Sequence, residues 1–494
     1  MNSRRISKTK SIETDIVVIG GGGCGMAAAV AAAEKGAKVV LLEKKGAPGG
    51  NSVYAHGIFA AESPAQRRLS IDISKDEMFT IYMEHAHWKV NPRIFRALVD
   101  KSGDTIRWLE DKGLEFDSIP PMYAGYHLRT WHGISNKIAG IEILKTLREN
   151  GEELGVEFYF YCDAKKILTD EKGSVSGIMA ETKGQELRIN AKTVIIATGG
   201  YGGNKELLKK YRPFYTEDII YLGLPHIVGD GLQMATQIGA ATEGLGFLHL
   251  YAYWFPGAGN VNGIAQEPYT LGVNKSGERF ADEALTLRPA ECGNAVDRQP
   301  DKCVYALFDE KLKNRLMEEG FLRGGLGWMS GVKVPNLDNE LKAEADKGGV
   351  KIADSWDDIA GWMGADPEVL KSTVEEYNAF CDRWHDELFA KDRRYLQALR
   401  TPPFYAIKCY LCFLTTTGGI KINHHMEVLN EQGKPIPGLY AGGDATGGWE
   451  SDTYCLIASG HEFGFAVNSG RIPGENATKN ALGAHDPGAT LQGY

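Results

Sequence analysis

Apolar and polar positions alternate with two different periods along this chain, which predicts a mixed α/β fold. An apolar run at residues 15–19 leads into a glycine cluster, and an alanine-rich stretch with helical character follows at residues 26–34. A second apolar run at residues 38–42 completes a strand, a tight turn, a helix and a strand, the pattern of a nucleotide-binding β-α-β unit. We therefore predict a Rossmann-like unit over residues 15–53.

The same patterning divides the chain into domains. Helical periodicity at residues 75–110 and 140–154 is followed by strand-like runs, whereas beyond residue 247 aromatic residues crowd in and short strands alternate with charged helices. This change predicts an α+β cap domain inserted into the nucleotide-binding domain. The predicted division is a first part of the nucleotide-binding domain at 12–246, a cap or substrate domain at 247–403, a second part of the nucleotide-binding domain at 404–477, and a C-terminal tail at 478–494.

The glycine cluster has the spacing of a dinucleotide-binding turn. Gly20, Gly22 and Gly25 stand in G-x-G-x-x-G register between the first strand and the helix. A side chain at these positions would keep the backbone away from a pyrophosphate seated at the helix N-terminus. Glu43 follows about 20 residues later, where a carboxylate can accept a hydrogen bond from a ribose hydroxyl. An ordinary tight turn is the alternative, but the combination of strand, helix and acid favours a dinucleotide.

Composition limits the remaining function classes. The 494 residues include 55 Lys and Arg against 64 Asp and Glu, which gives a formal net charge of −9. This balance argues against nucleic acid or an acidic membrane surface as the main partner. Residues 3–8 superficially resemble a twin-arginine export signal but lack a following apolar segment, and no run has the length of a transmembrane helix. We therefore expect a cytoplasmic protein without membrane insertion.

The cysteines do not indicate a disulfide framework or a metal site. The chain has eight of them at irregular spacings, which favours buried thiols. Cys409 and Cys412 form the only CxxC motif, and their apolar, strand-like surroundings favour core packing over metal or redox chemistry. The sequence also contains no haem-attachment motif and no iron–sulfur spacing. We expect no metal.

Several further segments carry a resemblance to a known family. They are residues 49–52, residues 197–204, residues 273–283, residues 417–420 and residues 437–444. In the last of these, Asp444 directly follows two glycines. Together with the glycine turn, they resemble the flavoprotein superfamily that includes fumarate reductase, succinate dehydrogenase, urocanate reductase and the 3-ketosteroid dehydrogenases, over about residues 14–477. The resemblance implies a domain that binds FAD, a mobile cap, and hydride transfer between flavin N5 and a carbon next to an activating group.

The resemblance also implies which residues contact FAD. Asp444 matches an acid that reaches the ribityl chain, and Asn51 stands where membrane-bound relatives attach FAD covalently through a histidine. FAD is therefore expected to bind non-covalently. The other implied contacts come from Gly20, Gly22, Gly25, Glu43, Lys44, Gly50, Ser52, Ala164, Thr198, Gly199 and Ile457.

The chain departs from the relatives that bind dicarboxylates. Tyr251 replaces their substrate-binding histidine, another histidine is missing from residues 413–419, and arginines are missing from residues 265–270 and 452–460. Removing one partner of a buried ion pair costs about 3–5 kcal/mol, so fumarate and succinate are expected to bind weakly. The replacements are aromatic, which favours an apolar or ring-containing ligand, although core packing is the alternative for each residue. They are Tyr251, Tyr253, Trp254, Phe255, Tyr269 and Tyr454.

Catalytic roles are implied for an arginine and two tyrosines. Arg288 falls near the arginine that delivers a proton in fumarate-type reductases, although its spacing from Glu283 is one residue longer, and a surface arginine is the alternative. Because arginine is a very weak acid, with a pKa above about 12, anchoring the substrate or polarising a carbonyl is equally consistent with this position. Tyr454 stands where ketosteroid dehydrogenases carry a tyrosine that hydrogen-bonds the substrate ketone, and Tyr251 takes the place of a substrate-binding histidine.

We therefore expect an FAD-dependent ene-reductase that transfers hydride to the β-carbon and a proton to the α-carbon of an apolar enone or aromatic acrylate. A ketosteroid-type dehydrogenase running in the oxidative direction is the alternative, and Arg288 in place of a tyrosine favours reduction. A flavin electron-transfer subunit without its own substrate is the alternative of another class, but such a carrier needs no large aromatic cap. Because the sequence contains no convincing second nucleotide site, we expect electrons from an external donor or carrier protein.

Overall fold

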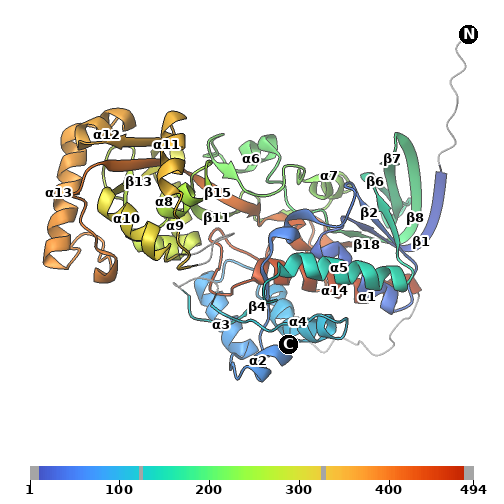
Figure 1. Cartoon of the computed structure of the whole chain (residues 1–494). Helices are drawn as coiled ribbons and strands as arrows, with labels where there is room; N and C mark the ends of the chain where they lie inside the picture. The colour runs from blue at the N-terminus through green and yellow to red at the C-terminus, as the bar shows by residue number, and fades with distance from the viewer. Residues whose placement is uncertain (1–9, 122–125, 324–329, 483–494) are drawn as a thin grey trace, which may run out of the picture.

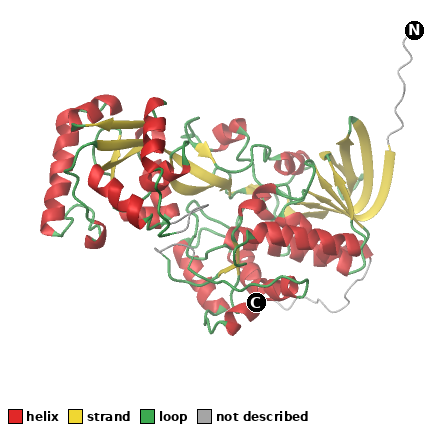
Figure 2. Cartoon of the chain, viewed as in Figure 1, coloured by secondary structure: helices red, strands yellow, loops and turns green. Residues whose placement is uncertain are grey.

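Two β-sheets form the centres of two units that lie side by side (Figure 1). The computed structural model describes residues 10–121, 126–323 and 330–482. Figure 2 shows helices around the strands of the second unit, whereas the first unit carries helices against one side of its sheet. This arrangement confirms the predicted α/β class with an added α+β unit.

The first sheet has a parallel core of buried strands. Its strands are β1 (Lys10–Ile19), β2 (Val39–Glu43), β5 (Glu157–Phe160), β6 (Cys162–Thr169), β7 (Val175–Thr182), β8 (Gln185–Ile196), β17 (Glu427–Leu429) and β18 (Pro435–Ala441). The path is β17-β18-β8-β1-β2-β5, with β7 pairing β8 and β6 pairing β7. Along the part of this path that runs β18-β8-β1-β2-β5, each strand is parallel to its neighbour. Ile16 of β1, for example, stands opposite Val39 of β2. Residues 16–19 of β1 and residues 39–42 of β2 are buried apolar runs, as is typical of central parallel strands.

Small residues bring the C-terminal helix back to the nucleotide-binding turn. α1 (Gly23–Glu34) buries a run of alanines because α14 (His461–Leu482) lies directly against it. A Cβ on Gly470 of α14 would lie 2.1 Å from the Cys24 carbonyl oxygen, so the approach requires glycine. α5 (Ala139–Glu153) also packs against α1.

A helical layer precedes α5 in the chain and lies along the lower part of Figure 1. It contains α2 (Pro64–Arg68), α3 (Lys75–His85) and α4 (Pro92–Glu110), with the short strands β3 (Gly57–Phe59) and β4 (Trp131–Gly133) and the 3₁₀ turn η1 (Gly50–Tyr54) nearby. The predicted helical stretch at 75–110 is thus two helices, because Asn91 caps α4 and Pro92 disfavours a helical conformation before it.

The second sheet is organised around one long strand. Its strands are β9 (Ile220–Tyr221), β11 (Leu248–Trp254), β12 (Leu271–Asn274), β13 (Cys303–Asp309), β14 (Val350–Ala353) and β15 (Phe404–Thr416). β15 pairs antiparallel with β11, β13 and β14 and parallel with β9, and β12 pairs with β13. The predicted boundary after residue 403 therefore separates β15 from β11, β13 and β14, three of the strands with which it pairs.

The remaining helices flank this sheet or join the two units. They are α6 (Lys205–Tyr211), α7 (Asp230–Gln237), α8 (Gly259–Ala265), α9 (Pro289–Asp297), α10 (Glu310–Glu319), α11 (Leu337–Asp346), α12 (Trp356–Met363) and α13 (Pro367–Arg383). Short elements complete the chain: β10 (Thr242–Glu243), β16 (Gly419–Ile420), η2 (Glu283–Leu287), η3 (Pro300–Lys302), η4 (Arg393–Tyr395) and η5 (Gly443–Ala445).

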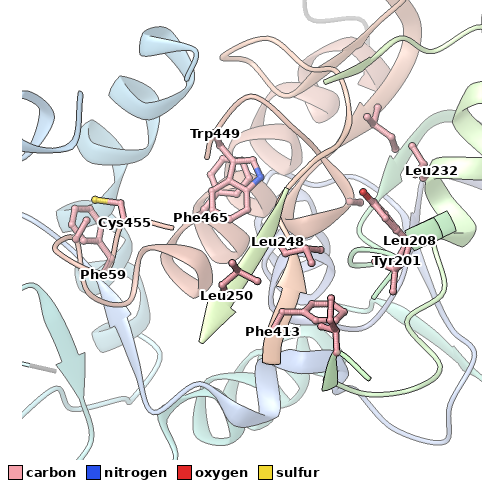
Figure 3. Close-up of a cluster of buried hydrophobic side chains, with 14 of the residues drawn as sticks. Phe59, Tyr201, Leu208, Leu232, Leu248, Leu250, Phe413, Trp449, Cys455 and Phe465 are labelled. Carbon is pink, nitrogen blue, oxygen red and sulfur yellow. The ribbon is translucent and has the colours of Figure 1, made fainter. Parts of the chain in front are cut away.

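A continuous apolar core joins the units. Figure 3 shows buried side chains from remote segments close to one another, among them Leu250 of β11, Phe413 of β15 and Phe465 of α14. Cys409 and Cys412 are buried free thiols on β15, where core packing was expected. Over the described ranges, no helix has the length and apolar content needed to span a bilayer. The twin-arginine-like segment lies outside the described part of the chain.

Candidate active site

A cavity opens where the first sheet, the start of α1 and the strand β11 meet. It encloses about 1610 Å³, counting the space at its open mouth. Its lining comes from the turn at 19–24, the segments 42–57 and 162–164, the loop 197–199, parts of 222–230, β11, and the segment 442–466. These segments include those in which the sequence predicted the dinucleotide site.

The three motif glycines serve different purposes. Gly22 lines the cavity, and a Cβ there would find its nearest protein atom at 3.6 Å, so the missing side chain leaves room for a ligand. Gly20 also lines the cavity, but its φ of +107° and a Cβ position 2.4 Å from the Ala197 carbonyl oxygen require glycine for the fold itself. Gly25 lies outside the lining. A Cβ there would be 1.8 Å from the Gly20 carbonyl oxygen, so Gly25 sets the close packing of helix on strand.

The start of α1 can bind an anion. The residues Gly22 to Cys24 line the cavity, no side chain caps this helix, and its first turn carries no acidic residue. The Gly23 amide donates to Ser52 Oγ at 3.0 Å, which fixes the neighbouring turn. First-turn amides together with the positive end of the helix dipole favour a pyrophosphate at this position.

Glu43 and Lys44 fix the end of β2 at the cavity. Glu43 accepts hydrogen bonds from the backbone N–H of Gly21 at 2.8 Å and of Lys45 at 2.7 Å. A carboxylate has about four acceptor sites, so Glu43 can accept a ribose hydroxyl as well. The Lys44 Nζ lies 2.5 Å from Asp230 Oδ2, which ties β2 to α7 across the cavity wall.

Asn51 joins the turn after β2 to two other segments. Its Oδ1 accepts from the Leu224 N–H at 2.9 Å, and its Nδ2 lies 3.4 Å from both the Tyr221 hydroxyl and the Leu414 carbonyl. The side chain therefore holds its orientation at the wall, but an amide offers no nucleophilic nitrogen for a covalent flavin link. Other predicted contacts that line the cavity are Gly50, Ser52, Ala164, Thr198 and Gly199.

Asp444 presents an unsatisfied oxygen to the cavity. Its Oδ2 accepts from Thr415 Oγ1 at 2.9 Å, whereas its Oδ1 is buried and has no partner among the described residues. Burial raises the pKa of Asp444 well above its ordinary value, and the nearby charge of Glu462 adds to this rise. A buried carboxyl oxygen without a partner in the fold is suited to a hydrogen bond with a ligand hydroxyl.

The part of the lining near β11 and residues 454–456 is apolar and aromatic. It belongs to a cluster formed by Tyr126, Tyr251, Ala290, Cys412, Tyr454 and Leu456, against which Leu222, Trp254, Leu414 and Ile457 pack. Of these, Tyr251, Tyr454, Leu456, Leu222 and Leu414 line the cavity itself. Among the described lining residues, Lys44 alone carries a permanent positive charge, and it is paired with Asp230.

An imidazole–carboxylate pair that was not predicted from the sequence lies beside Tyr454. His249 Nδ1 and Glu462 Oε2 are 2.5 Å apart, and the His249 ring stacks on the Tyr454 ring with centroids 3.3 Å apart. Burial lowers the pKa of His249 well below its ordinary value and raises the pKa of Glu462 to about 7. A signal existed for His249, since residues 249 and 251 of one strand point to the same face.

A bulge in β11 decides which aromatic residues reach the cavity. Ala252 has a φ of +53°, and the pairing of β11 with β15 shifts between Leu250 and Tyr253. Tyr251 lies before this shift and lines the cavity, whereas Tyr253 lies after it and donates from its hydroxyl to the Ala265 carbonyl at 2.9 Å. Of the predicted aromatic set, Tyr253, Trp254, Phe255 and Tyr269 lie outside the lining.

Arg288 and Ile457 also lie outside the lining. Arg288 is exposed and immediately precedes α9. It lies two residues before Ala290, a member of the aromatic cluster, and its charge offsets part of the rise that burial causes in the pKa of Tyr126. The Tyr126 hydroxyl donates to Glu291 of α9 at 2.7 Å.

A buried arginine that was not predicted lies behind Tyr251. The Arg323 Nη2 donates to the Tyr251 hydroxyl at 3.4 Å, and its Nε donates to the Thr286 carbonyl at 2.7 Å. The backbone N–H of Arg323 donates to Glu267 Oε1 at 3.0 Å. No motif surrounds Arg323 in the sequence, so its neighbourhood follows from the tertiary fold alone.

Comparison with known proteins gives the family. The family model described as the FAD binding domain matches residues 15–454. A vinyl phenol reductase of Lactiplantibacillus plantarum is 32% identical over 479 residues, which cover 94% of this chain and 96% of that protein. The open conformation of a flavocytochrome c3 fumarate reductase matches with a TM-score of 0.75 and 27% identity, covering 96% of this chain and 79% of that one. A Rhodococcus jostii 3-ketosteroid dehydrogenase shares the fold, with a TM-score of 0.75 and 23% identity over 97% of this chain and 99% of that one.

The chain belongs to this FAD-binding flavoprotein family. It is an FAD-dependent oxidoreductase related to the fumarate reductases, and it shares the fold of the 3-ketosteroid dehydrogenases. The residues present fit the cofactor: the start of α1 can hold the pyrophosphate, Glu43 a ribose hydroxyl, and the unpartnered Asp444 Oδ1 a ribityl hydroxyl.

Proposed function

We propose that this flavoenzyme reduces a carbon–carbon double bond in an apolar, ring-containing substrate rather than in a dicarboxylate. The observation that carries the proposal is the apolar, aromatic lining around Tyr251 and Tyr454, to which no arginine of the described chain contributes. Similarity to a vinyl phenol reductase supports it. A vinyl phenol, an aromatic acrylate or a ketosteroid-like enone buries a large ring, and such a surface gains about 25 cal/mol for each Å² of apolar area removed from water.

The chain's own residues would orient the substrate and supply a proton. Bound FAD supplies hydride transfer at flavin N5. Tyr251 is the better proton donor, because the Arg323 guanidinium behind it would stabilise the negative charge left on its oxygen. Tyr454 is less suited to this role, because burial raises its pKa well above its ordinary value.

Oxidation of a ketosteroid-like substrate is the second candidate function. It is favoured by Tyr454, which lines the cavity. This residue matches the tyrosine with which ketosteroid dehydrogenases hydrogen-bond the substrate ketone. Both reactions use a dissociable FAD and an external electron donor or acceptor.

Anaerobic stopped-flow measurements test the proposal. Dithionite-reduced, FAD-loaded enzyme is mixed separately with 4-vinylphenol, cinnamate, an androstenedione and fumarate, and flavin reoxidation is followed by absorbance. We expect at least one ring-containing alkene to reoxidise the flavin tenfold faster than fumarate. Fastest reoxidation by fumarate, or none by any alkene, would contradict a ring-selective reductase. A carrier without its own substrate would also show no ligand-induced shift in the flavin spectrum.

A further inference from the structure

Glu462 is an acidic group within the aromatic part of the cavity. It stands in the first turn of α14 and lines the cavity, with its side chain 21% exposed. We propose that Glu462, positioned by His249, is a specificity filter that rejects carboxylate ligands and admits a neutral ring bearing a hydroxyl group. This inference rests on the proposed function and narrows its substrate class to phenol-type aryl alkenes, as opposed to aromatic acrylates.

His249 acts as a positioning residue for the Glu462 carboxyl group. Its side chain is 4% exposed, and its Nδ1 lies 2.5 Å from Glu462 Oε2. Stacking on Tyr454 fixes the plane of the imidazole, so the carboxyl group is held at one place on the wall. In the neutral histidine tautomer, Nδ1–H donates to this carboxylate.

The charges around Glu462 do not favour a second carboxylate. The titratable groups that face it are His249 from β11, Tyr221 from β9, His461 from α14, and Asp444, Glu450 and Tyr454 from the segment between β18 and α14. His461 Nε2 is 2.6 Å from Glu450 Oε2, so the nearest other imidazole is already paired. Among the described residues, no lysine or arginine forms an ion pair with Glu462.

Above neutral pH a ligand carboxylate would therefore enter beside the ionised Glu462 without a counter-ion, which disfavours binding. A phenol, by contrast, can donate a charge-assisted hydrogen bond to Glu462. Because burial raises the pKa of Glu462 to about 7, the filter is strongest above neutral pH and weakens as the carboxyl group takes up a proton.

Two unreactive ligands isolate the effect of the carboxylate. 4-Ethylphenol and 3-(4-hydroxyphenyl)propanoate both carry a phenol, and only the second carries a carboxylate. Their affinities for oxidised, FAD-loaded enzyme are measured at pH 8 from changes in the flavin spectrum. We expect the wild type to bind 4-ethylphenol at least tenfold more tightly, and Glu462→Gln to reduce this ratio at least tenfold, about 1.4 kcal/mol.

Asp452→Asn is the matched control. It removes a carboxylate from the same segment, but Asp452 lies outside the cavity lining and forms a surface ion pair with Lys89. The ratio of affinities should stay at the wild-type value in this variant. A ratio that falls equally in both variants would indicate a general charge effect and overturn the filter.

The wild type provides a second test that needs no substitution. Between pH 8 and pH 5.5 both ligands keep their charge, since a phenol titrates near pH 10 and a carboxyl group near pH 4.3. We expect the preference for 4-ethylphenol to decrease as the pH is lowered from 8 to 5.5. This result would support the role of Glu462 even if Glu462→Gln does not retain FAD.

The outcomes separate the filter from the proposed reaction. A ratio that depends neither on pH nor on Glu462 overturns the filter, even if vinyl arenes are reduced. Discrimination between the ligands without turnover of any alkene supports the filter and contradicts the reductase. If neither ligand changes the flavin spectrum, both proposals are wrong.

Discussion

Two tyrosine hydroxyls near the cavity differ in what lies behind them. Tyr251 has the Arg323 guanidinium within 3.4 Å, whereas Tyr454 stacks on the neutral ring of His249. A positive charge stabilises the anion that a proton donor leaves, whereas burial and the nearby carboxyl group of Glu462 oppose that anion and raise the pKa of Tyr454. At the scale of single residues, the surroundings therefore favour Tyr251 as the proton donor and Tyr454 as a residue that contacts the substrate.

Tyr251→Phe should reduce kcat for alkene reduction by about 10²–10⁴-fold, the usual contribution of a positioned acid. FAD affinity should change less than twofold, because the ring that packs in the wall is retained. Tyr454→Phe is the matched variant, and we expect it to lower kcat less than tenfold. Single-turnover reoxidation of reduced enzyme at saturating alkene measures both. A larger effect at Tyr454 would transfer the proton-donor role to that residue.

A buried carboxyl group next to Arg323 predicts how stability varies with pH. Glu267 is fully buried, and burial raises its pKa from 4.5 to about 7, although backbone hydrogen bonds from Arg323 and Leu322 oppose the rise. The folded state thus binds this proton more tightly than the unfolded state. The contribution of Glu267 to stability is therefore greatest below about pH 4.5 and decreases as the pH rises to about 7.

Glu267→Gln imitates the protonated group and should remove this dependence. We expect its Tm to rise relative to the wild type between pH 5 and pH 8, by an amount of order 1–3 kcal/mol in free energy. Thermal melts of FAD-loaded protein across this range provide the measurement. Parallel pH profiles for the two proteins would mean that Glu267 is ionised in the fold at every pH tested.

Several of the expected site residues that line the cavity have positions set by local spacing. Glu43 and Asn51 occupy fixed distances from the glycine turn, and Asp444 directly follows two glycines, so short-range spacing carries the information. His249, Glu462 and Arg323 acquire their partners from segments far away in the chain. No local pattern specifies such pairs, because they depend on how β11, α14 and the cap pack together.

At the scale of elements, close approaches between backbone segments explain why the glycines of the motif are not interchangeable. Gly22 has an extended backbone and open space toward the cavity, whereas Gly25 faces the backbone of Gly20 across the β1–α1 contact. One position is reserved for the cofactor and the other for helix–strand packing. The motif alone treats them as equivalent, and only the structure separates them.

Gly22→Ala and Gly25→Ala should therefore fail in different ways. In Gly22→Ala the apo protein should keep its stability within about 0.5 kcal/mol, while FAD affinity falls at least tenfold because the methyl group occupies pyrophosphate space. In Gly25→Ala the clash with the Gly20 carbonyl should destabilise the apo protein by about 1–3 kcal/mol or more. Apo thermal melts and FAD titration by flavin fluorescence distinguish the two. Equal destabilisation of both apo variants would contradict the division.

Elements whose position depends on non-local pairing were predicted least well. The sequence showed aromatic residues crowding in beyond residue 247, but the bulge at Ala252, which turns Tyr253 away from the cavity, has no signature such as a glycine. Likewise, the composition changes near residue 403, whereas β15 continues the second sheet beyond it. Strand pairing, which sets both features, is decided by tertiary contacts.

At the scale of the whole molecule, one cavity draws on both sheets. β2, α1 and the 442–466 segment supply the part suited to a dinucleotide, and β11 of the second sheet supplies the aromatic part. A ligand that binds this cavity therefore contacts segments from residue 19 to residue 466, and it stabilises the folded chain by mass action. FAD should accordingly stabilise the whole protein.

Apo protein titrated with FAD should show a Tm that rises continuously with FAD concentration, since a hundredfold excess over Kd contributes about 2.7 kcal/mol. FMN provides the matched ligand, because it carries the isoalloxazine and ribityl groups but lacks the AMP half that the Gly22 turn and Glu43 would bind. We expect FMN at equal concentration to raise the Tm much less than FAD, and Glu43→Gln to reduce the FAD effect while leaving the FMN effect unchanged. Acid precipitation of the loaded enzyme should release FAD into the supernatant, because Asn51 offers no covalent anchor. Equal stabilisation by FMN and FAD would show that the glycine turn and Glu43 contribute nothing to cofactor binding. Yellow colour retained in the acid-precipitated pellet would show that FAD is bound covalently elsewhere on the chain.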